Sequence, residues 1–406
     1  MTTAALLWLD SLQGSGIRPG LGRMRALLRQ LGRPERACPS IIVSGTNGKG
    51  STSSTLASIL NVSRYRTGLY TSPHLVELRE RWTIGGAMID DDALSDAIDR
   101  LHLAADRAGI VPTYFEALTL IAFIAFAQAR CDVAVLEVGM GGRLDATNVV
   151  RPLAALITPV GFDHMEFLGT TIRKIAAEKA GVIHRGAIVL TSNDDSAVLA
   201  VLRKRSVKFG NPFHVVTERH ATPLAGAFQE RNAALAVRAA EELMARLPKI
   251  TPESIERGVA ATRWRGRLER IEHGGKQIWI DGGHNAHAIT AVAPFITARV
   301  TSPRLLVFGI MGEKDIDDVT AALFPMFDAI IATEPYPPRS APATQLVEIA
   351  RRMSIDAEAE PEPKRAIASA LASRYRSIVI AGSLYLAGAA IDFFDAQRNE
   401  ENNHQE

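Results

Sequence analysis

The stretch Ile41–Thr55, IIVSGTNGKGSTSST, decides the fold class of the amino-terminal part of this 406-residue chain. An apolar run is followed by glycines on both sides of Lys49 and then by a helix-prone segment rich in Ser and Thr. Backbone N–H groups uncovered by glycine, a lysine and the positive end of a helix are the parts from which proteins build phosphate sites. The stretch therefore predicts a strand, a phosphate-binding loop and a helix, in that order.

The spacing of this loop differs from that of the usual P-loop, in which Ser or Thr follows the lysine directly. Here Gly50 stands between Lys49 and Ser51, and only two residues separate Gly45 from Gly48. We expect the loop to bind the phosphates of a nucleotide through Asn47, Gly48, Lys49, Gly50 and Ser51.

Length and composition indicate a soluble globular protein of two domains. The chain is 47% hydrophobic and 22% charged, which is typical of a protein with a substantial core. A net charge of +2 is too balanced to indicate nucleic-acid binding. Cys38 and Cys131 fit neither a disulfide framework nor a zinc site, which favours a reducing compartment.

The segments that might target a membrane do not have the required pattern. The start, MTTAALLWLDSLQGSG, has no basic region and contains Asp10, so we expect no signal peptide. The apolar run Ala117–Ala129 is shorter than the ~20 residues of a spanning helix and predicts a buried core helix. We therefore expect a cytoplasmic monomer that binds small molecules, with neither nucleic acid nor membrane as a partner.

Strand-like runs alternate with helical patterns over the first two thirds of the chain. The expected strands are Ile41–Ser44, Thr67–Thr71, Asp132–Val138, Ala154–Val160 and Ala187–Thr191. Between them the expected helices include Ser51–Leu60, Asp91–Ala108 and Phe115–Ala129. Nearly continuous apolar strands separated by helices predict a parallel sheet covered on both faces.

The alternating pattern then restarts, which predicts a second and smaller α/β unit. Its strands are expected at Arg304–Gly309, Ala329–Thr333 and Ser377–Ala381. The predicted fold is α/β, with a P-loop-containing parallel-sheet ATP-binding domain over residues 1–285 and a smaller Rossmann-like α/β domain over residues 286–406. We expect Ile278–Asn285, with its two glycines, to be the hinge between them.

Polar residues follow the ends of the predicted strands of the first domain, where ligands bind in doubly wound sheets. Ser72 follows the second strand, Glu137 ends the third and His164 follows the fourth. Alone, Ser72 would be a turn residue and His164 a hydrogen-bonding one, but a carboxylate at the end of a buried strand indicates function. A hydroxyl, a carboxylate and an imidazole near a phosphate loop predict a site for Mg²⁺.

Several blocks together carry a resemblance to a known family. They are GTNGKGS (45–51), TSPHL (71–75), TYFEALT (113–119), LEVGMGGRLDATN (136–148), DHMEFLGTTIRKIAAEKAG (163–181), GRLERI (266–271), DGGHN (281–285) and AGSLYLAG (381–388). In this order they resemble the signature blocks of the folylpolyglutamate synthase and dihydrofolate synthase family of the Mur ligase superfamily. The glycine between the lysine and the hydroxyl is typical of that family.

The resemblance implies ATP-dependent amide formation. An acid substrate, dihydropteroate or a folate, would take the γ-phosphate of ATP to give an acyl phosphate, which the amine of L-glutamate would then attack. Two Mg²⁺ ions would neutralise charge on the phosphates, and such a transfer depends mainly on positioning and electrostatics.

The resemblance also implies roles for individual residues. The implied catalytic residues are Lys49, Lys179 and His284, with Lys179 carbamylated. The implied metal ligands are Ser72, Glu137 and His164, with Ser51 near the nucleotide-bound ion. Further implied nucleotide contacts are Asn232, Arg267 and Asp281. The implied contacts to the acid substrate are Tyr114, Phe115, Glu116, Leu144, Asp145 and Ala146, and Ser383 is implied for glutamate.

Two features differ from the family pattern. The segment between Gly186 and Phe228 is shorter than usual, and Arg18 occupies a position where some members have Asp. A related ligase for a non-folate acid therefore remains an alternative. A P-loop ATPase or kinase is less compatible with the intact DGGHN and AGSLYLAG blocks. An inactive relative that only binds is less compatible with a full set of implied site residues, namely Lys49, Glu137, His164, Lys179, Arg267, Asp281 and His284. The sequence does not distinguish addition of the first glutamate from extension of a polyglutamate.

Overall fold

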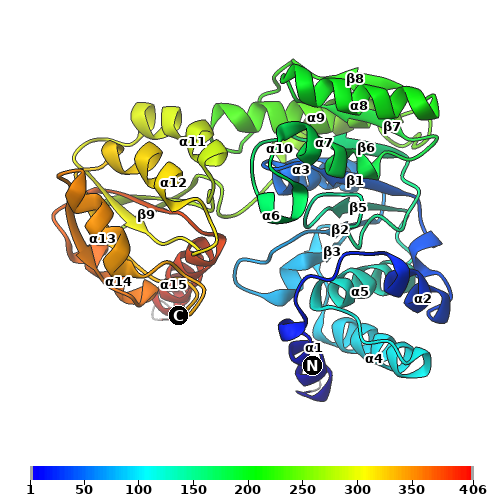
Figure 1. Cartoon of the computed structure of the whole chain (residues 1–406), viewed down its shortest axis with the longest axis horizontal. Coiled ribbons are helices and arrows are strands. Elements are labelled where there is room, and N and C mark those ends of the chain that lie inside the picture. The colour runs from blue at the N-terminus through cyan, green and yellow to red at the C-terminus, as the bar shows by residue number, and fades with distance from the viewer. Residues whose placement is uncertain (1–2, 404–406) are drawn as a thin grey trace. The chain divides into compact units, whose positions relative to one another are not determined.

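The computed structural model describes residues 3–403 and has the expected α/β fold (Figure 1). It comprises two compact units, of which the first contains residues 3–73, 79–223 and 229–263. The second contains residues 74–78, 224–228 and 264–403. Each unit is built on its own sheet, which confirms the predicted α/β fold class with a second α/β unit.

The first unit contains an eight-stranded sheet with the order β4-β3-β2-β5-β1-β6-β7-β8. Its strands are β1 (Ser40–Ser44), β2 (Thr67–Tyr70), β3 (Trp82–Ile84), β4 (Ala87–Met88), β5 (Val133–Glu137), β6 (Ala154–Ile157), β7 (Ile188–Thr191) and β8 (Phe213–Val215). The six strands from β2 to β8 in this order are parallel, whereas β3 and β4 are antiparallel. The parallel sheet expected from the apolar runs is thus confirmed.

Helices cover both faces of this sheet. The helices of the first unit are α1 (Thr3–Ser11), α2 (Gly22–Gln30), α3 (Lys49–Val62), α4 (Asp91–Ala108), α5 (Tyr114–Gln128), α6 (Met165–Leu168), α7 (Ile172–Lys179), α8 (Ser196–Phe209), α9 (Ala227–Leu243, whose first two residues belong to the second unit) and α10 (Pro252–Ala260). Short 3₁₀ helices are η1 (Gln13–Ser15), η2 (Pro34–Arg36), η3 (Leu78–Arg81) and η4 (Ala180–Val182). Ile41 and Val43 of β1 pack with α3, α9 and α10 in one core cluster, as the alternation of side chains along a strand requires.

The apolar run at Ala117–Ala129 lies in α5 and ends at its C-cap residue, and the helix is buried over most of its length. Its start is fixed by a capping box, in which the Thr113 hydroxyl accepts from Glu116 N and the Glu116 carboxylate accepts from Thr113 N. In Figure 1, α5 lies beside α4. No helix among residues 3–403 is both long and apolar enough to span a bilayer.

The second unit contains a six-stranded sheet with the order β13-β12-β11-β14-β10-β9. Its strands are β9 (Glu269–His273), β10 (Lys276–Asp281), β11 (Arg304–Phe308), β12 (Ala329–Ala332), β13 (Asp356–Ala359) and β14 (Ser377–Ala381). Its helices are α11 (Ala286–Arg299), α12 (Ile316–Leu323), η5 (Phe324–Met326), α13 (Ala343–Arg352), α14 (Pro363–Ala372) and α15 (Leu384–Asn403). Ile378 and Ile380 of β14 face a core with α14 and α15, whereas Val379 and Ala381 face a core with α11, α12 and α13.

The division between the units differs from the join expected near residue 285. The structure divides between Arg263 and Trp264, and Ile278–Asp281 forms part of β10, which pairs with β9 and β14. A Cβ atom on Gly282 would lie 2.4 Å from Leu384 Cδ2, so this glycine is tightly packed within the second unit. The first four residues of the stretch expected to be the hinge, Ile278–Asp281, therefore belong to the second sheet.

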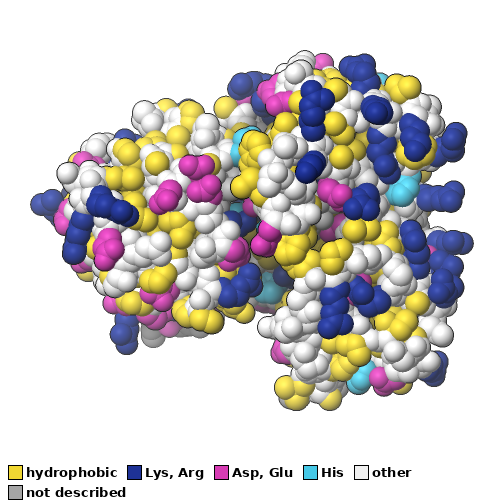
Figure 2. All heavy atoms as spheres, in the orientation of Figure 1, with side chains coloured by type: hydrophobic (Ala, Val, Ile, Leu, Met, Phe, Trp, Pro, Cys, Tyr) yellow, Lys and Arg dark blue, Asp and Glu magenta, His cyan; other side chains and the backbone are white. Residues whose placement is uncertain are grey.

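Charged side chains are unevenly distributed over the surface. Figure 2 shows Lys and Arg gathered over α8, where Arg203, Lys204 and Lys208 are exposed. Over the second unit the same view shows both signs of charge interspersed.

Candidate active site

The phosphate loop lies at the carboxyl end of β1, a central strand with β5 and β6 as its neighbours. Parallel strands bring the segments that follow them to one edge of the sheet. Accordingly, the Ser44 hydroxyl donates to Gly141 O at 2.8 Å, and Thr46 N donates to Pro159 O at 2.9 Å. Helix α3 begins directly behind the loop, with Gly48 as its N-cap residue, so the positive end of the helix meets the loop.

Two glycines of the loop are required by what surrounds them. Gly45 has φ +146°, and a Cβ atom there would lie 1.8 Å from Thr158 Oγ1. Gly48 has φ +86°, and a Cβ atom there would lie 2.3 Å from Asn232 Oδ1. The structure therefore places Asn232 against the phosphate loop in spite of the short segment that precedes it.

Lys49 and Lys179 converge on the loop backbone. Lys49 Nζ donates to Thr46 O at 2.9 Å and to Gly45 O at 3.3 Å, while Lys179 Nζ donates to Gly45 O at 2.7 Å. Burial, and secondly the nearby charge of Lys49, lower the pKa of Lys179 to about 7, against the opposing effect of Asp163 and Asp145. Near neutral pH the Lys179 amine is consequently neutral for much of the time.

Glu137 ends β5 with its side chain buried, and its Oε2 accepts a hydrogen bond from Ser72 N at 3.2 Å. The structure thus brings together two of the three expected metal ligands. The third, His164, is exposed at the start of α6, with Nε2 3.8 Å from Asp163 Oδ1. Within residues 3–403 no group of three or more His, Cys, Asp and Glu side chains is arranged to hold a metal ion. A metal at Glu137 would therefore take most of its ligands from hydroxyls, water and bound phosphate, which is how proteins usually hold Mg²⁺.

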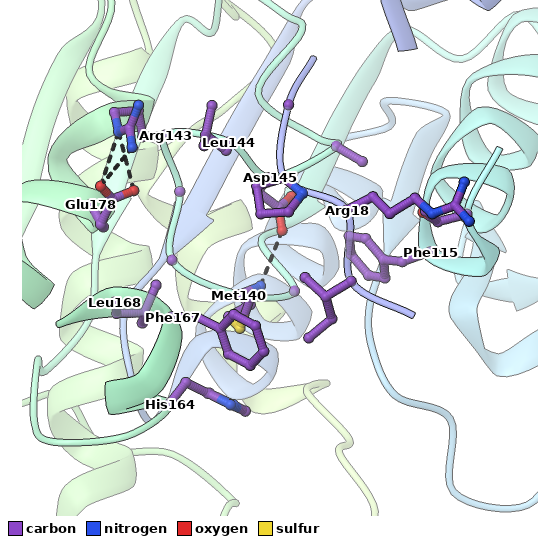
Figure 3. Close-up of a pocket in the computed structure, with 18 of the residues that line it drawn as sticks. Arg18, Phe115, Met140, Arg143, Leu144, Asp145, His164, Phe167, Leu168 and Glu178 are labelled. Carbon is purple, nitrogen blue, oxygen red and sulfur yellow. Dashed lines mark hydrogen bonds and ion pairs between the residues drawn. The ribbon is translucent and has the colours of Figure 1, made fainter. Parts of the chain in front are cut away.

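A cavity of about 390 Å³ opens beside these residues in the first unit (Figure 3). Its walls come from the segments 16–20 and 139–146, from the start of α5 and from the region of α6 and α7. The lining includes Phe115, Glu116, Leu144, Asp145, Ala146 and His164. Tyr114 is not among the lining residues that the structure describes, and its backbone N–H donates to Ser15 Oγ at 3.0 Å. Five of the six residues expected to contact the acid substrate thus share one cavity.

Asp145 is buried in the cavity wall, and its carboxylate accepts three hydrogen bonds. The donors are Met140 N at 3.0 Å, Thr147 N at 2.9 Å and the Thr147 hydroxyl at 2.6 Å. Burial raises the pKa of Asp145, and these hydrogen bonds oppose that rise. The carboxylate therefore shapes the turn as well as facing the cavity.

The cavity wall is packed directly onto the helix that carries Lys179. Arg143 N donates to Glu178 O at 2.8 Å, and the Arg143 guanidinium pairs with the Glu178 carboxylate at 2.9 Å, a pair drawn in Figure 3. A Cβ atom on Gly142 would lie 2.8 Å from Lys179 O, and one on Gly181 would lie 2.3 Å from Arg143 Cα. Such close backbone approaches make the wall and the Lys179 segment one packed body.

In the second unit, four expected residues lie near the carboxyl ends of neighbouring strands. Asp281 ends β10, pairs in register with Ala381 of β14, and accepts hydrogen bonds from Leu268 N at 3.0 Å and Gly283 N at 2.8 Å. Burial raises the pKa of Asp281, and the Arg267 guanidinium opposes that rise. Of the other members, His284 Nδ1 lies 2.9 Å from Gly282 O, and Ser383 Oγ accepts from Tyr385 N at 3.1 Å.

Comparison with known proteins identifies the family. Residues 43–221 match the Mur ligase middle domain, and residues 266–384 match the glutamate ligase domain of Mur ligases. The chain is 32% identical to the dihydrofolate synthase/folylpolyglutamate synthase of Bacillus subtilis strain 168 over 412 residues, which cover 93% of this chain and 95% of the relative. The chain belongs to the dihydrofolate synthase and folylpolyglutamate synthase family of Mur ligases.

Solved structures of this family have the same fold over nearly the whole chain. Escherichia coli FolC in complex with DHPP and ADP is similar with a TM-score of 0.87 and 28% identity, covering 97% of this chain and 98% of FolC. Mycobacterium tuberculosis folylpolyglutamate synthase, complexed with ADP and AMPPCP, gives 0.86 and 32%, covering 96% and 98%. The fold class expected for a dihydrofolate synthase and folylpolyglutamate synthase is thereby confirmed.

Some residues around the site carry no recognisable signal in the sequence. Thr158 lies behind Gly45, and Arg23 pairs with Glu116 across 93 residues of sequence. Neither belongs to a motif with a known spacing, so only the folded structure of this family member brings them to the loop and the cavity.

Proposed function

We propose that this chain is an ATP-dependent ligase that joins L-glutamate to dihydropteroate, to a folate, or to both. The observation that carries the proposal is the continuity between cavity and phosphate loop. Gly142 of the cavity wall lies against Lys179 O, and Lys179 Nζ is hydrogen-bonded to Gly45 of the loop. An acid bound in the cavity is in this way adjacent to the place where the phosphates of ATP would bind.

The reaction has two steps. A carboxylate oxygen of the acid attacks the γ-phosphorus of ATP, the bond to the β–γ bridging oxygen breaks, and ADP leaves. The glutamate amine then attacks the carbonyl carbon of the acyl phosphate, inorganic phosphate leaves, and an amide is formed with loss of a proton. Lys49 and the N–H groups at the start of α3 would hold the phosphates and neutralise charge, because such transfers depend on positioning and electrostatics.

Mg²⁺ is the metal that suits the available ligands. Glu137, Ser72 and His164 would hold an ion, and Ser51 at the start of α3 would face the nucleotide-bound one. When bound, Mg²⁺ supplies neutralisation of the phosphate charge. One buried carboxylate beside a serine fits an ion that keeps water and phosphate as most of its other ligands.

Lys179 is the residue we propose to be carbamylated. Its lowered pKa, about 7, provides a neutral amine near neutral pH. That amine attacks the carbon of CO₂, an N–C bond forms, and one proton is released. The product is a carboxylate, which would replace a buried cation close to Lys49 by an anion.

The remaining contacts are assigned by position. Asn232 beside the loop, and Arg267 and Asp281 in the second unit, are proposed for the nucleotide. His284 is proposed to act at the acyl phosphate, and Ser383 to bind glutamate. The acid substrate is proposed to contact Tyr114, Phe115, Glu116, Leu144, Asp145 and Ala146.

We further propose that the protein works in the cytoplasm as a monomer. Both Cys38 and Cys131 are free thiols in the structure, which suits a reducing compartment. Size-exclusion chromatography with light scattering tests the monomer, and a dimer mass would contradict it.

The proposed activity is tested by release of ADP from ATP in the presence of Mg²⁺ and L-glutamate. Three reactions are compared, with dihydropteroate, with tetrahydrofolate and without an acceptor. We expect ADP release that requires both glutamate and one of the acceptors. Release that is independent of the acceptor would indicate an ATPase, and the absence of release with either acceptor would favour a ligase for a different acid.

A further inference from the structure

One wall of the cavity is formed by Gly16–Gly20, which we name the cavity loop. We propose that Arg23 is a positioning residue that holds the cavity loop in place and thereby sets the affinity for the acid substrate. The inference rests on the proposed function only in naming the ligand of the cavity. The hydrogen bonds by which Arg23 holds the cavity loop all lie within the first unit.

Arg23 joins two parts of the cavity wall. Its Nε donates to Glu116 Oε2 at 2.9 Å, and its Nη2 donates to Arg18 O in the cavity loop. The Glu116 side chain is only 7% exposed and that of Arg23 is 29% exposed, so the pair is largely shielded from solvent. A planar guanidinium with several fixed donors suits such a bridge, whereas a lysine ammonium is a single point charge on a flexible stem.

The partner of Arg23 is itself fixed. Glu116 Oε2 also accepts from Thr113 N at 2.8 Å and so belongs to the capping box of α5. The same turn of helix carries Phe115, which lines the cavity and is drawn in Figure 3 with Arg18. Arg23 therefore anchors the cavity loop to the helix end that positions the aromatic wall.

A second hydrogen bond to the start of α5 lies just before the first residue of the cavity loop. Tyr114 N donates to the hydroxyl of Ser15, the residue that precedes Gly16. The contacts of Arg23 and of Ser15 both lead to the start of α5. Together they fix the start of the cavity loop and the position of the Arg18 carbonyl.

Between these contacts the cavity loop has little packing of its own. Ile17 is 55% exposed, the Arg18 side chain is exposed, and Cβ atoms built on Gly16 and Gly20 meet no atom within 4 Å. A segment with few buried apolar contacts opens readily unless specific bonds restrain it. The position of this wall therefore depends on Arg23 more than on a core.

The test compares Arg23→Gln and Arg23→Lys with a matched control, Arg25→Ala. Arg25 is exposed on the same helix, α2, two positions away. Hydrogen exchange of the amides of residues 16, 17, 18 and 20 reports the order of the cavity loop without any substrate. Michaelis constants for dihydropteroate, tetrahydrofolate, ATP and glutamate report which binding step depends on Arg23.

For Arg23→Gln we expect exchange in the cavity loop to be faster by about tenfold and the KM for the acid substrate to rise by about tenfold, as for loss of one charge-assisted hydrogen bond. The KM for ATP should stay within about twofold of the parent, since the hydrogen bonds of Arg23 described above lead to the cavity loop and to α5. Arg23→Lys should give an intermediate result and Arg25→Ala the parental one.

Unchanged hydrogen exchange of the cavity loop in Arg23→Gln would show that Arg23 does not hold this loop. Faster exchange with an unchanged KM for the acid, or with equal rises in the KM for the acid and for ATP, would reduce Arg23 to a structural role. If the parent turned over neither acceptor, the proposed function would fail, and the exchange measurement would still decide whether Arg23 holds the cavity loop.

Discussion

Lys49 and Lys179 share one hydrogen-bond acceptor, since their Nζ atoms lie 3.3 Å and 2.7 Å from the carbonyl oxygen of Gly45. Two ammonium groups at one carbonyl repel each other, and burial of Lys179 adds to the cost of its charge. Phosphate bound at the loop would relieve the charge on Lys49, and carbamylation would relieve that on Lys179. The arrangement thus favours a site with bound phosphate and a carbamylated Lys179 over an empty one.

The first prediction concerns Lys49→Ala. Turnover should fall by more than about a hundredfold, because the charge that holds the phosphates is lost. The folded protein should be at least as stable, since a repulsive partner of Lys179 has been removed. Steady-state ADP release and thermal unfolding measure the two effects. A strongly lowered melting temperature would show that Lys49 is structural instead.

The second prediction concerns carbamylation of Lys179. With carbon-13-labelled bicarbonate, the parent should show a carbamate carbon resonance that Lys179→Ala lacks. Activity should be lost in Lys179→Ala and partly restored by a small carboxylate such as formate in excess. A resonance of equal intensity in both proteins, or an ammonium on Lys179 with ATP and Mg²⁺ bound, would contradict the assignment.

The third prediction is a dependence of stability on pH. The pKa of Lys179 is about 7 in the folded protein and 10.5 ordinarily, so between these values the unfolded chain binds a proton that the folded one does not. Stability from this group therefore rises with pH across that window and is lowest below it. In buffer free of CO₂, the free energy of unfolding of the parent relative to Lys179→Met should increase from about pH 7 to about pH 9. Identical pH dependence of the two proteins would argue against a lowered pKa.

The fourth prediction uses two glycines of nearly identical backbone conformation. Gly48 has φ +86° and faces Asn232 Oδ1, whereas Gly186 has φ +87° and open space. Gly186→Ala should cost about 1–2 kcal/mol from backbone strain alone. Gly48→Ala should cost about 1–3 kcal/mol more from overlap with Asn232, and it should weaken ADP binding. Chemical denaturation and calorimetric titration with ADP measure both, and equal costs at the two positions would mean that Asn232 does not pack on the loop.

Much of the sheet could be predicted because its strands are short apolar runs between helices. The run at Ile41–Ser44 corresponds to β1, and the pattern at Ser377–Ala381 matches β14 to the residue. The strands β4 and β13 could not be predicted, because Ala87–Met88 is too short and Asp356–Ala359 too polar to show a pattern. These edge strands form through pairing with a neighbour that only the folded sheet supplies.

The division between Arg263 and Trp264 differs from the join expected near residue 285 for a related reason. The segment before Gln277 is polar and shows no strand pattern, yet Glu269–His273 forms β9, which pairs antiparallel with β10. A charged edge strand with one half-exposed face has no continuous apolar run. The boundary therefore follows from strand pairing and not from composition.

The candidate site was predictable where chemistry is concentrated in contiguous blocks, as at Lys49 or Asp145. Tyr114 belongs to such a block but lies outside the described cavity lining, because successive residues of a helix point in different directions. Arg23 lies outside any expected block, and its role depends on a partner brought near by folding. Motif spacing thus indicates the chemistry, whereas the supporting contacts require the structure.

An oxygen isotope tests most directly whether ATP activates the carboxylate of an acid bound beside the phosphate loop. Dihydropteroate or tetrahydrofolate labelled with oxygen-18 in the reacting carboxylate is incubated with the protein, ATP, Mg²⁺ and L-glutamate. We expect transfer of one labelled oxygen to the released inorganic phosphate for each amide formed. Amide formation with no labelled oxygen in the released phosphate would contradict an acyl phosphate intermediate.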